Sequence, residues 1–201
     1  MRAGYGMSRG KVEDCVAVIG LGYVGMPVAL EAVRVGLPVI GFDVSETVVG
    51  GLNAGVSHID DLTDEDVQFM LSKGFRALSD AAALSDAAVV VICVPTPLDK
   101  DLGPNLEAVE AAGRSVAANL RAGQLIVLES TSYPGTTEEV LQPILESSGL
   151  KAGEDFALAY SPERIDPGND AFQLRNTPKV VGGLSAECTR QAADFYMQLV
   201  D

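Results

Sequence analysis

The stretch Val16-Ala-Val-Ile-Gly20-Leu-Gly22-Tyr-Val-Gly25 joins a short apolar segment to the pattern G-x-G-x-x-G. Residues 16–19 predict a buried strand, and residues 27–35, after the glycines, predict a helix. In such a unit Gly20 permits a tight turn, Gly22 lets the backbone approach a pyrophosphate, and Gly25 lets the helix pack closely on the strand. The start of the helix offers free N–H groups and partial positive charge to phosphates. The stretch therefore predicts a dinucleotide-binding βαβ unit.

A carboxylate follows the next predicted strand, at residues 38–42. Asp43 stands 18 positions after Gly25. A carboxylate at this place accepts hydrogen bonds from the adenosine ribose hydroxyls and repels a 2′-phosphate, so the sequence predicts NAD rather than NADP. The alternative is that the glycines only shape a turn and that Asp43 only caps one. The succession of strand, loop, helix, strand and acid disfavours that alternative.

Apolar and amphipathic segments alternate along the rest of the chain. Further strands are predicted at residues 75–78, 88–94, 125–128, 156–160 and 179–181, and helices at 45–53 (with Ser45 as N-cap), 63–72 (opened by Thr63), 106–120, 136–146 (with Pro143 as a candidate kink) and 185–200. This alternation predicts an α/β fold, with a Rossmann-like, doubly wound, mainly parallel sheet and helices on both faces. We expect residues 15–201 to form this domain and residues 1–14 to be a flexible N-terminal extension. The chain stops within a predicted amphipathic helix, which is typical of a piece of a longer protein.

Composition and charge exclude several classes of protein. The net charge of −14 argues against general nucleic-acid binding. The cysteines Cys15, Cys93 and Cys188 form no CxxC pair, and His58 has no ligand-type neighbours, so we expect no metal site, no disulfide framework and a cytoplasmic location. No apolar run reaches about 18 residues, so no membrane span is expected.

Four more segments follow predicted strands. They are Val94-Pro-Thr-Pro97, Ser130-Thr-Ser-Tyr-Pro-Gly-Thr-Thr137, Ser161-Pro-Glu-Arg-Ile-Asp-Pro-Gly168 and Asn176-Thr-Pro-Lys179. Because parallel strands end at one edge of a sheet, the first three should converge on one cleft. Together with the glycine loop, these segments resemble the UDP-glucose/GDP-mannose dehydrogenase family, over roughly Val16 to the end of the chain. The forms of the second and third are most similar to the branch that oxidises UDP-N-acetylhexosamines, such as UDP-N-acetylglucosamine or UDP-N-acetylmannosamine.

The resemblance implies a reaction. Family members oxidise the C6 alcohol of a nucleotide sugar to a carboxylate with two NAD per turnover, through an aldehyde captured by a cysteine thiolate. The family's nucleophilic cysteine and its catalytic lysine and asparagine lie beyond residue 201. We therefore expect this chain alone to bind NAD without turning over a UDP-sugar, and its own cysteines to be packing residues. Relatives dimerise through a helix after this domain, so a homodimer is expected for the complete enzyme.

The resemblance also implies roles for single residues. Glu163 and Thr131 would be catalytic, with Glu163 assisting general-base and hydrolysis steps and Thr131 positioning water near the nicotinamide. Glu163, Arg164 and Ile165 would contact the sugar nucleotide. The cofactor-binding residues would be Gly20, Leu21, Gly22, Tyr23, Val24, Gly25, Asp43, Val94, Pro95, Thr96, Ser130 and Thr131. The alternative for Glu163 is a surface carboxylate paired with Arg164. Val48 stands where many relatives carry a basic residue, so one adenosine-side contact of the family has no counterpart here.

Two other functions remain to be weighed. One is a stand-alone NAD-binding or regulatory module, in which Glu163 and Thr131 would have no use. The other is a different NAD enzyme of related architecture, such as a hydroxyacyl or phosphogluconate dehydrogenase. The combination of Ser-Thr-x-x-Pro-Gly-Thr-Thr with Ser-Pro-Glu-Arg argues against the latter.

Overall fold

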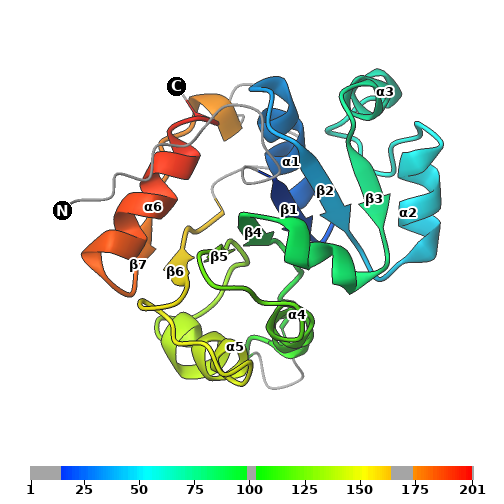
Figure 1. The fold of residues 1–201 in the computed structure, drawn as a ribbon. Helices are drawn as coiled ribbons and strands as arrows, with labels where there is room; N and C mark the ends of the chain where they lie inside the picture. The colour runs from blue at the N-terminus through cyan, green and yellow to red at the C-terminus, as the bar shows by residue number, and fades with distance from the viewer. Residues whose placement is uncertain (1–14, 99–102, 164–173, 201) are drawn as a thin grey trace.

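A seven-stranded sheet in the order β3-β2-β1-β4-β5-β6-β7 forms the centre of the protein (Figure 1). The structure is a computed structural model that describes residues 15–98, 103–163 and 174–200, so the predicted extension at residues 1–14 lies outside the described residues. The strands are β1 (Val16–Ile19), β2 (Val39–Phe42), β3 (Arg76–Leu78), β4 (Val89–Ile92), β5 (Leu125–Leu128), β6 (Ala157–Tyr160) and β7 (Gly182–Gly183). Strands β1 to β6 are parallel, and β7 is antiparallel to β6. The predicted doubly wound, mainly parallel sheet is confirmed.

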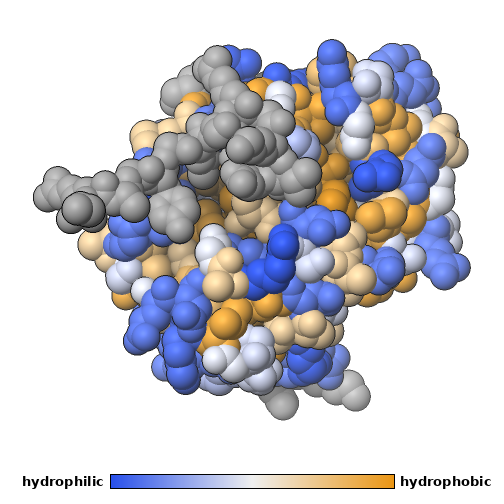
Figure 2. All heavy atoms as spheres, viewed as in Figure 1, coloured by the Kyte–Doolittle hydropathy of each residue, from blue (hydrophilic) through white to orange (hydrophobic). Residues whose placement is uncertain are grey.

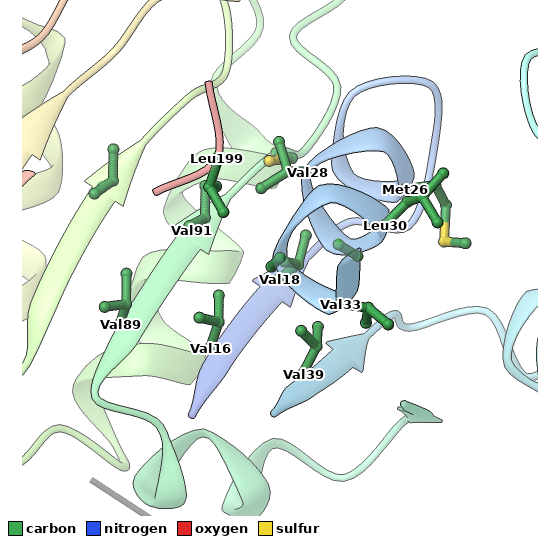
Figure 3. Packing of buried hydrophobic residues seen from close by; sticks show 14 of the residues in the cluster. Val16, Val18, Met26, Val28, Leu30, Val33, Val39, Val89, Val91 and Leu199 are labelled. Carbon is green, nitrogen blue, oxygen red and sulfur yellow. The ribbon is translucent and has the colours of Figure 1, made fainter. Parts of the chain in front are cut away.

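Helices cover both faces of this sheet (Figure 1). One face carries α1 (Gly25–Arg34), α2 (Glu46–Asn53), α3 (Asp64–Ser72) and α6 (Ala186–Tyr196), and the other carries α4 (Glu107–Ala117) and α5 (Gln142–Glu146). Strands β1, β4, β5 and β6 therefore contribute alternate side chains to two cores. In β1, Val16 and Val18 pack toward α1 (Figure 3), whereas Ala17 and Ile19 pack toward the other face. Within the described part of the chain, no helix combines the length and the apolar character needed to cross a bilayer.

Side-chain caps begin several of the helices where the sequence predicts a start. The Ser45 hydroxyl accepts a hydrogen bond from the Val48 N–H at the start of α2. Thr63 and Asp66 form a capping box at the start of α3, in which each side chain accepts a hydrogen bond from the other residue's backbone N–H. Such caps satisfy N–H groups that have no partner within the helix. The two predicted N-termini are confirmed.

Two predicted elements differ from the structure. The predicted strand at residues 179–181 is wrong, because pairing with β6 is confined to β7 and the Lys179 side chain turns into the interior. The predicted helix at residues 136–146 begins with a π-helical turn, η3 (Thr137–Leu141), before α5. Pro143 is the second residue of α5, which continues directly from η3, so the kink at Pro143 stays a prediction. Among the described residues, the short 3-10 helices η2 (Ala81–Asp86) and η4 (Leu174–Asn176) were not predicted.

The substitution Gly183→Ala tests how closely β7 lies against α6. A Cβ at Gly183 would lie 2.5 Å from the Thr189 backbone N and 2.6 Å from the Cys188 Cβ. We expect this overlap to lower the free energy of unfolding by about 1–3 kcal/mol, as measured by urea denaturation followed by circular dichroism. The matched control is Gly182→Ala, whose Cβ meets no atom within 4 Å and which should change stability by less than about 0.5 kcal/mol. Equal stability of the two variants would contradict the close contact.

Candidate functional site

The residues that directly follow five parallel strands form one row along the carboxyl edge of the sheet. The strand register joins the last residues of β2, β1, β4, β5 and β6 in a continuous series. The residues next in the chain are, in the same order, Asp43, Gly20, Cys93, Glu129 and Ser161, which we call the edge row. The backbone N–H of each donates to a carbonyl oxygen of the neighbouring strand, over 2.8–3.1 Å. The winding of the chain reverses between β1 and β4, and a ligand crevice is expected at that point.

The glycine loop fits tightly between β1, α1 and β4. Gly20 has a φ of +88°, and a Cβ there would lie 2.7 Å from the Cys93 carbonyl oxygen. A Cβ at Gly25 would lie 1.9 Å from the carbonyl oxygen of Gly20. A Cβ at Gly22, by contrast, would meet no atom within 4 Å. The fold therefore leaves no room for a side chain at Gly20 or Gly25, whereas Gly22 has open space on the side of the crevice.

The start of α1 is suited to an anion. Its N-cap residue, Val24, makes no side-chain cap, and the first turn holds no acidic residue. Backbone N–H groups and the positive end of the helix dipole are thus directed at the space beside Gly22. Leu21 is fully buried and Val24 packs against the core, whereas Tyr23 is 42% exposed. The described residues fit the pyrophosphate of a dinucleotide.

Asp43 connects the glycine loop to the turn that opens α2. Its Oδ2 accepts a hydrogen bond from the Leu21 N–H, and its Oδ1 accepts one from the Ser45 N–H, each over 2.9 Å. Sequence analysis did not foresee the bond to Leu21, which lies 22 positions away in the chain, whereas the bond to Ser45 is the turn-capping role that it weighed as an alternative. A carboxylate oxygen has two lone pairs, so each remains able to accept a second hydrogen bond from a ribose hydroxyl.

The loops after β4 and β5 lie side by side, as the prediction of a shared cleft requires. The Thr96 hydroxyl donates to the Thr131 carbonyl oxygen over 2.6 Å. The buried Ser130 hydroxyl donates to the Ile92 carbonyl oxygen over 3.4 Å. Val94 is partly buried, whereas Pro95 and Thr131 are exposed. The structure therefore brings the predicted cofactor residues of the two loops to one part of the edge.

Glu163 follows β6 and completes the predicted set at this edge. Its side chain is partly buried. It lies near Glu129, whose pKa is raised mainly by burial and also by the negative charge of Glu163. Arg164 and Ile165, the other predicted sugar-nucleotide contacts, lie outside the described residues, as does the alternative pairing of Glu163 with Arg164.

A buried ionic cluster behind the edge row was not predicted. Glu129 is fully buried, and its carboxylate accepts hydrogen bonds from the Lys179 ammonium group and the Tyr196 hydroxyl. We call Glu129, Lys179 and Tyr196 the buried triad. Burial raises the pKa of Glu129 to about 7, although Lys179 and Tyr196 act to lower it. Burial, and next the charge of Glu129, raise the pKa of Tyr196 well above its usual value. One signal in the sequence was a carboxylate placed directly after the apolar run of β5.

The cysteines have the burial expected of packing residues. Cys15, Cys93 and Cys188 are buried free thiols. Burial, and next the charge of Glu129, raise the pKa of Cys93 well above its usual value, so that this thiol stays protonated near neutral pH. Among the residues that the structure describes, no three His, Cys, Asp or Glu side chains are grouped to hold a metal ion.

A pocket of about 430 Å³ lies beyond β5, at the end of the edge away from Asp43. The loop after β5 lines it from one side, at residues 132–135, and β7 lines it from the other. Tyr160, the last residue of β6, also contributes to its wall. On the face shown in Figure 2, hydrophobic residues are exposed between hydrophilic ones. The edge therefore offers a hollow as well as polar loops.

Comparison with known proteins agrees with this geometry. The model of the UDP-glucose/GDP-mannose dehydrogenase family, NAD binding domain, matches residues 14–200. The UDP-N-acetyl-D-mannosamine dehydrogenase of Pyrococcus horikoshii is 36% identical over 187 residues, which cover 92% of this chain and 44% of that protein. The UDP-N-acetyl-D-glucosamine 6-dehydrogenase of Salmonella typhi is 35% identical over 189 residues, 94% of this chain and 44% of that protein.

A solved structure shows the same fold. The UDP-D-ManNAc dehydrogenase from Pyrococcus horikoshii superposes with a TM-score of 0.87 at 36% identity, over 93% of this chain and 45% of that chain. The chain thus spans less than half the length of the relatives that it matches. The chain belongs to the UDP-glucose/GDP-mannose dehydrogenase family and corresponds to the NAD binding domain of its members.

Proposed function

We propose that this chain is the cofactor half of an NAD-dependent oxidoreductase that converts the C6 alcohol of a UDP-N-acetylhexosamine to the uronic acid. The observation that carries the proposal is the edge row, which places the glycine loop and Asp43 at one end and the loops of Thr131 and Glu163 at the other. The names of the relatives, which act on UDP-N-acetyl sugars, support this substrate class. NAD supplies the hydride acceptor for both oxidation steps.

At the adenosine end, the chain's own groups account for binding and selectivity. The open space at Gly22 and the N–H groups of α1 would receive the pyrophosphate. Asp43, already held by two backbone N–H groups, would present its remaining lone pairs to the ribose hydroxyls. Its negative charge would repel a 2′-phosphate, which favours NAD over NADP.

At the reaction end, two side chains would act on the substrate. The exposed Thr131, whose carbonyl is tied to Thr96, would position water near the nicotinamide. Glu163 would accept protons during oxidation and assist hydrolysis. The nucleophilic cysteine would come from the part of the complete enzyme that lies outside this chain, because the thiols of this chain are buried.

The alternative of a stand-alone NAD-binding module has less support. Such a module has no use for Thr131 and Glu163 at the edge of the sheet, and the match to the dehydrogenase family runs through both segments. We also propose that the enzyme is cytoplasmic, a location that the three free thiols favour. We further propose that the complete protein forms a homodimer.

Two substitutions in the glycine loop should change different properties of the protein: Gly22→Ala its affinity for NAD and Gly25→Ala its stability. Gly22→Ala adds a Cβ in open space, so we expect unchanged stability but NAD affinity lower by roughly ten-fold or more, because the pyrophosphate must approach there. Gly25→Ala forces its Cβ against Gly20 and should lower the free energy of unfolding by about 1–3 kcal/mol. Calorimetric titration and urea denaturation measure the two effects. Wild-type NAD affinity in Gly22→Ala would exclude this place for the pyrophosphate.

The substitution Asp43→Asn tests cofactor selection with little change of shape. We expect the wild-type chain to bind NAD more tightly than NADP. The variant should lose about 1–3 kcal/mol of NAD binding, the scale of a hydrogen bond to a charged group, and its preference for NAD should narrow. Calorimetry with both nucleotides measures this, with circular dichroism as the check of folding. A preference that does not change would show that Asp43 does not face the ribose.

The dehydrogenase activity itself is tested with two proteins. The 201-residue chain and the product of the complete reading frame are each incubated with NAD and UDP-N-acetylmannosamine, UDP-N-acetylglucosamine or UDP-glucose. We expect NADH only from the complete product, and more from the N-acetylated sugars than from UDP-glucose. NADH from the chain alone would contradict a nucleophile outside it. No NADH from any sugar with the complete product would contradict the proposed reaction.

A further inference from the structure

The buried triad joins three segments that are far apart in the sequence. Glu129 directly follows β5, Lys179 precedes β7, and Tyr196 ends α6. The Lys179 side chain is only 3% exposed, and its Nζ lies 5.1 Å from the centroid of the Tyr196 ring. Each oxygen of the Glu129 carboxylate accepts a hydrogen bond from a different member of the triad. The carboxylate is therefore held from two directions.

Packing alone does not explain these residue types. Removing a carboxylate and an ammonium group from water is costly, and well-packed apolar side chains of similar volume often stabilise a protein as well or better. The raised pKa of Glu129 reflects this burial, which the Lys179 charge only partly offsets. A buried pair of this kind is better suited to specifying a geometry than to adding stability.

Glu129 is also the residue from which the reaction end of the site is built. Its backbone N–H donates to the Ile92 carbonyl oxygen on β4 over 2.8 Å, and the Ser130 hydroxyl donates to the same oxygen. Next in the chain is Thr131, whose carbonyl oxygen accepts the Thr96 hydrogen bond. A displacement of Glu129 would therefore move both loops at once.

The triad lies under one half of the edge row. In the edge row Glu129 lies between Cys93, which follows β4, and Ser161, which follows β6, and its N–H donates to the last residue of β4. The triad thus lies beneath the ends of β4, β5 and β6. In a doubly wound sheet this half receives the second mononucleotide, across the switch point from the adenosine half.

We propose that Glu129, Lys179 and Tyr196 are positioning residues for the nicotinamide half of the cofactor. The triad locks the start of the loop after β5 against the segment before β7 and the last turn of α6. It thereby sets the place of Thr131 and, through the hydrogen bond between them, of Thr96. Preorganised supporting residues of this kind hold a site to its productive geometry. The inference rests on the proposed binding of NAD along the edge row.

Binding at the two halves of the site can be distinguished with two ligands, NAD and ADP-ribose, because ADP-ribose lacks the nicotinamide ring. The chain and its Glu129→Gln and Tyr196→Phe variants are titrated with each ligand by calorimetry. We expect the wild-type chain to bind NAD more tightly than ADP-ribose. Glu129→Gln should weaken NAD binding by about ten-fold or more, because small misplacements at a reaction site have large effects. It should leave ADP-ribose binding within about two-fold, because the adenosine half shares no partner with the triad. Tyr196→Phe should act in the same direction, but more weakly.

Two further variants make the result specific. Glu31→Gln removes another buried carboxylate, which pairs with Arg34 on α1 over 2.6 Å, and should leave the ratio of the two affinities unchanged. The double variant Glu129→Gln/Lys179→Met removes both charges of the pair, so that no buried charge remains without a partner. It provides the measurement if Glu129→Gln does not fold, and it too should lower NAD affinity relative to ADP-ribose.

The outcomes distinguish positioning from simple attachment of α6. If folded triad variants melt at lower temperature but keep the wild-type ratio of NAD to ADP-ribose affinity, the triad only anchors the helix and the proposal is overturned. Equal binding of both ligands by the wild-type chain also overturns it, because no nicotinamide contact would then exist to be positioned. Failure of the wild-type chain to bind either ligand contradicts the proposed function itself and removes the basis of this inference.

Discussion

The parallel pairing of β1 with both β2 and β4 is the constraint on which the rest of the structure depends. It aligns Asp43, Gly20 and Cys93 along one edge, with a hydrogen bond from each N–H to the neighbouring strand. Gly20 lies so close to the Cys93 carbonyl that no side chain fits between β1 and β4. Because the chain winds outward from this line in both directions, α1 and α4 cover opposite faces. The crevice for a dinucleotide opens between them.

Local backbone charge, rather than net charge, decides what this edge attracts. The chain carries a net charge of −14, which by itself repels phosphates. At physiological ionic strength, however, exposed charges are screened beyond about 8 Å. The start of α1 presents N–H groups and holds no acidic side chain in its first turn. An acidic protein can thus bind a dinucleotide at one helix end while disfavouring nucleic acids over the rest of its surface.

Two carboxylates restrain the two halves of the edge in the same way, in different surroundings. Asp43 uses one oxygen for the glycine loop and the other for the turn before α2, so it joins two backbone segments near the surface. Glu129 uses its oxygens for Lys179 and Tyr196, so it joins a loop, a helix and the start of an edge strand in the interior. A carboxylate with both oxygens engaged fixes the relative position of its partners. The pKa of Glu129 is raised because burial removes its charge from water.

Features that depend on residues close together in the chain can be predicted from the amino-acid sequence. The apolar runs of β1, β4 and β5, the glycine loop, Asp43 and the helix caps at Ser45 and Thr63 could all be predicted, because each follows from hydrophobic period, turn geometry or a local hydrogen bond. The family motifs also placed Thr96 and Thr131 in one part of the site.

Contacts between residues far apart in the chain, by contrast, follow from the folded arrangement of strands and helices. Residues 179–181 have the composition of a strand, yet the Lys179 side chain points into the interior and donates a hydrogen bond to Glu129, 50 positions away. No local pattern encodes that pairing. It exists because the alternation of side chains along β5 places Glu129 on the face that α6 covers, where a buried carboxylate requires a cation and a hydroxyl donor.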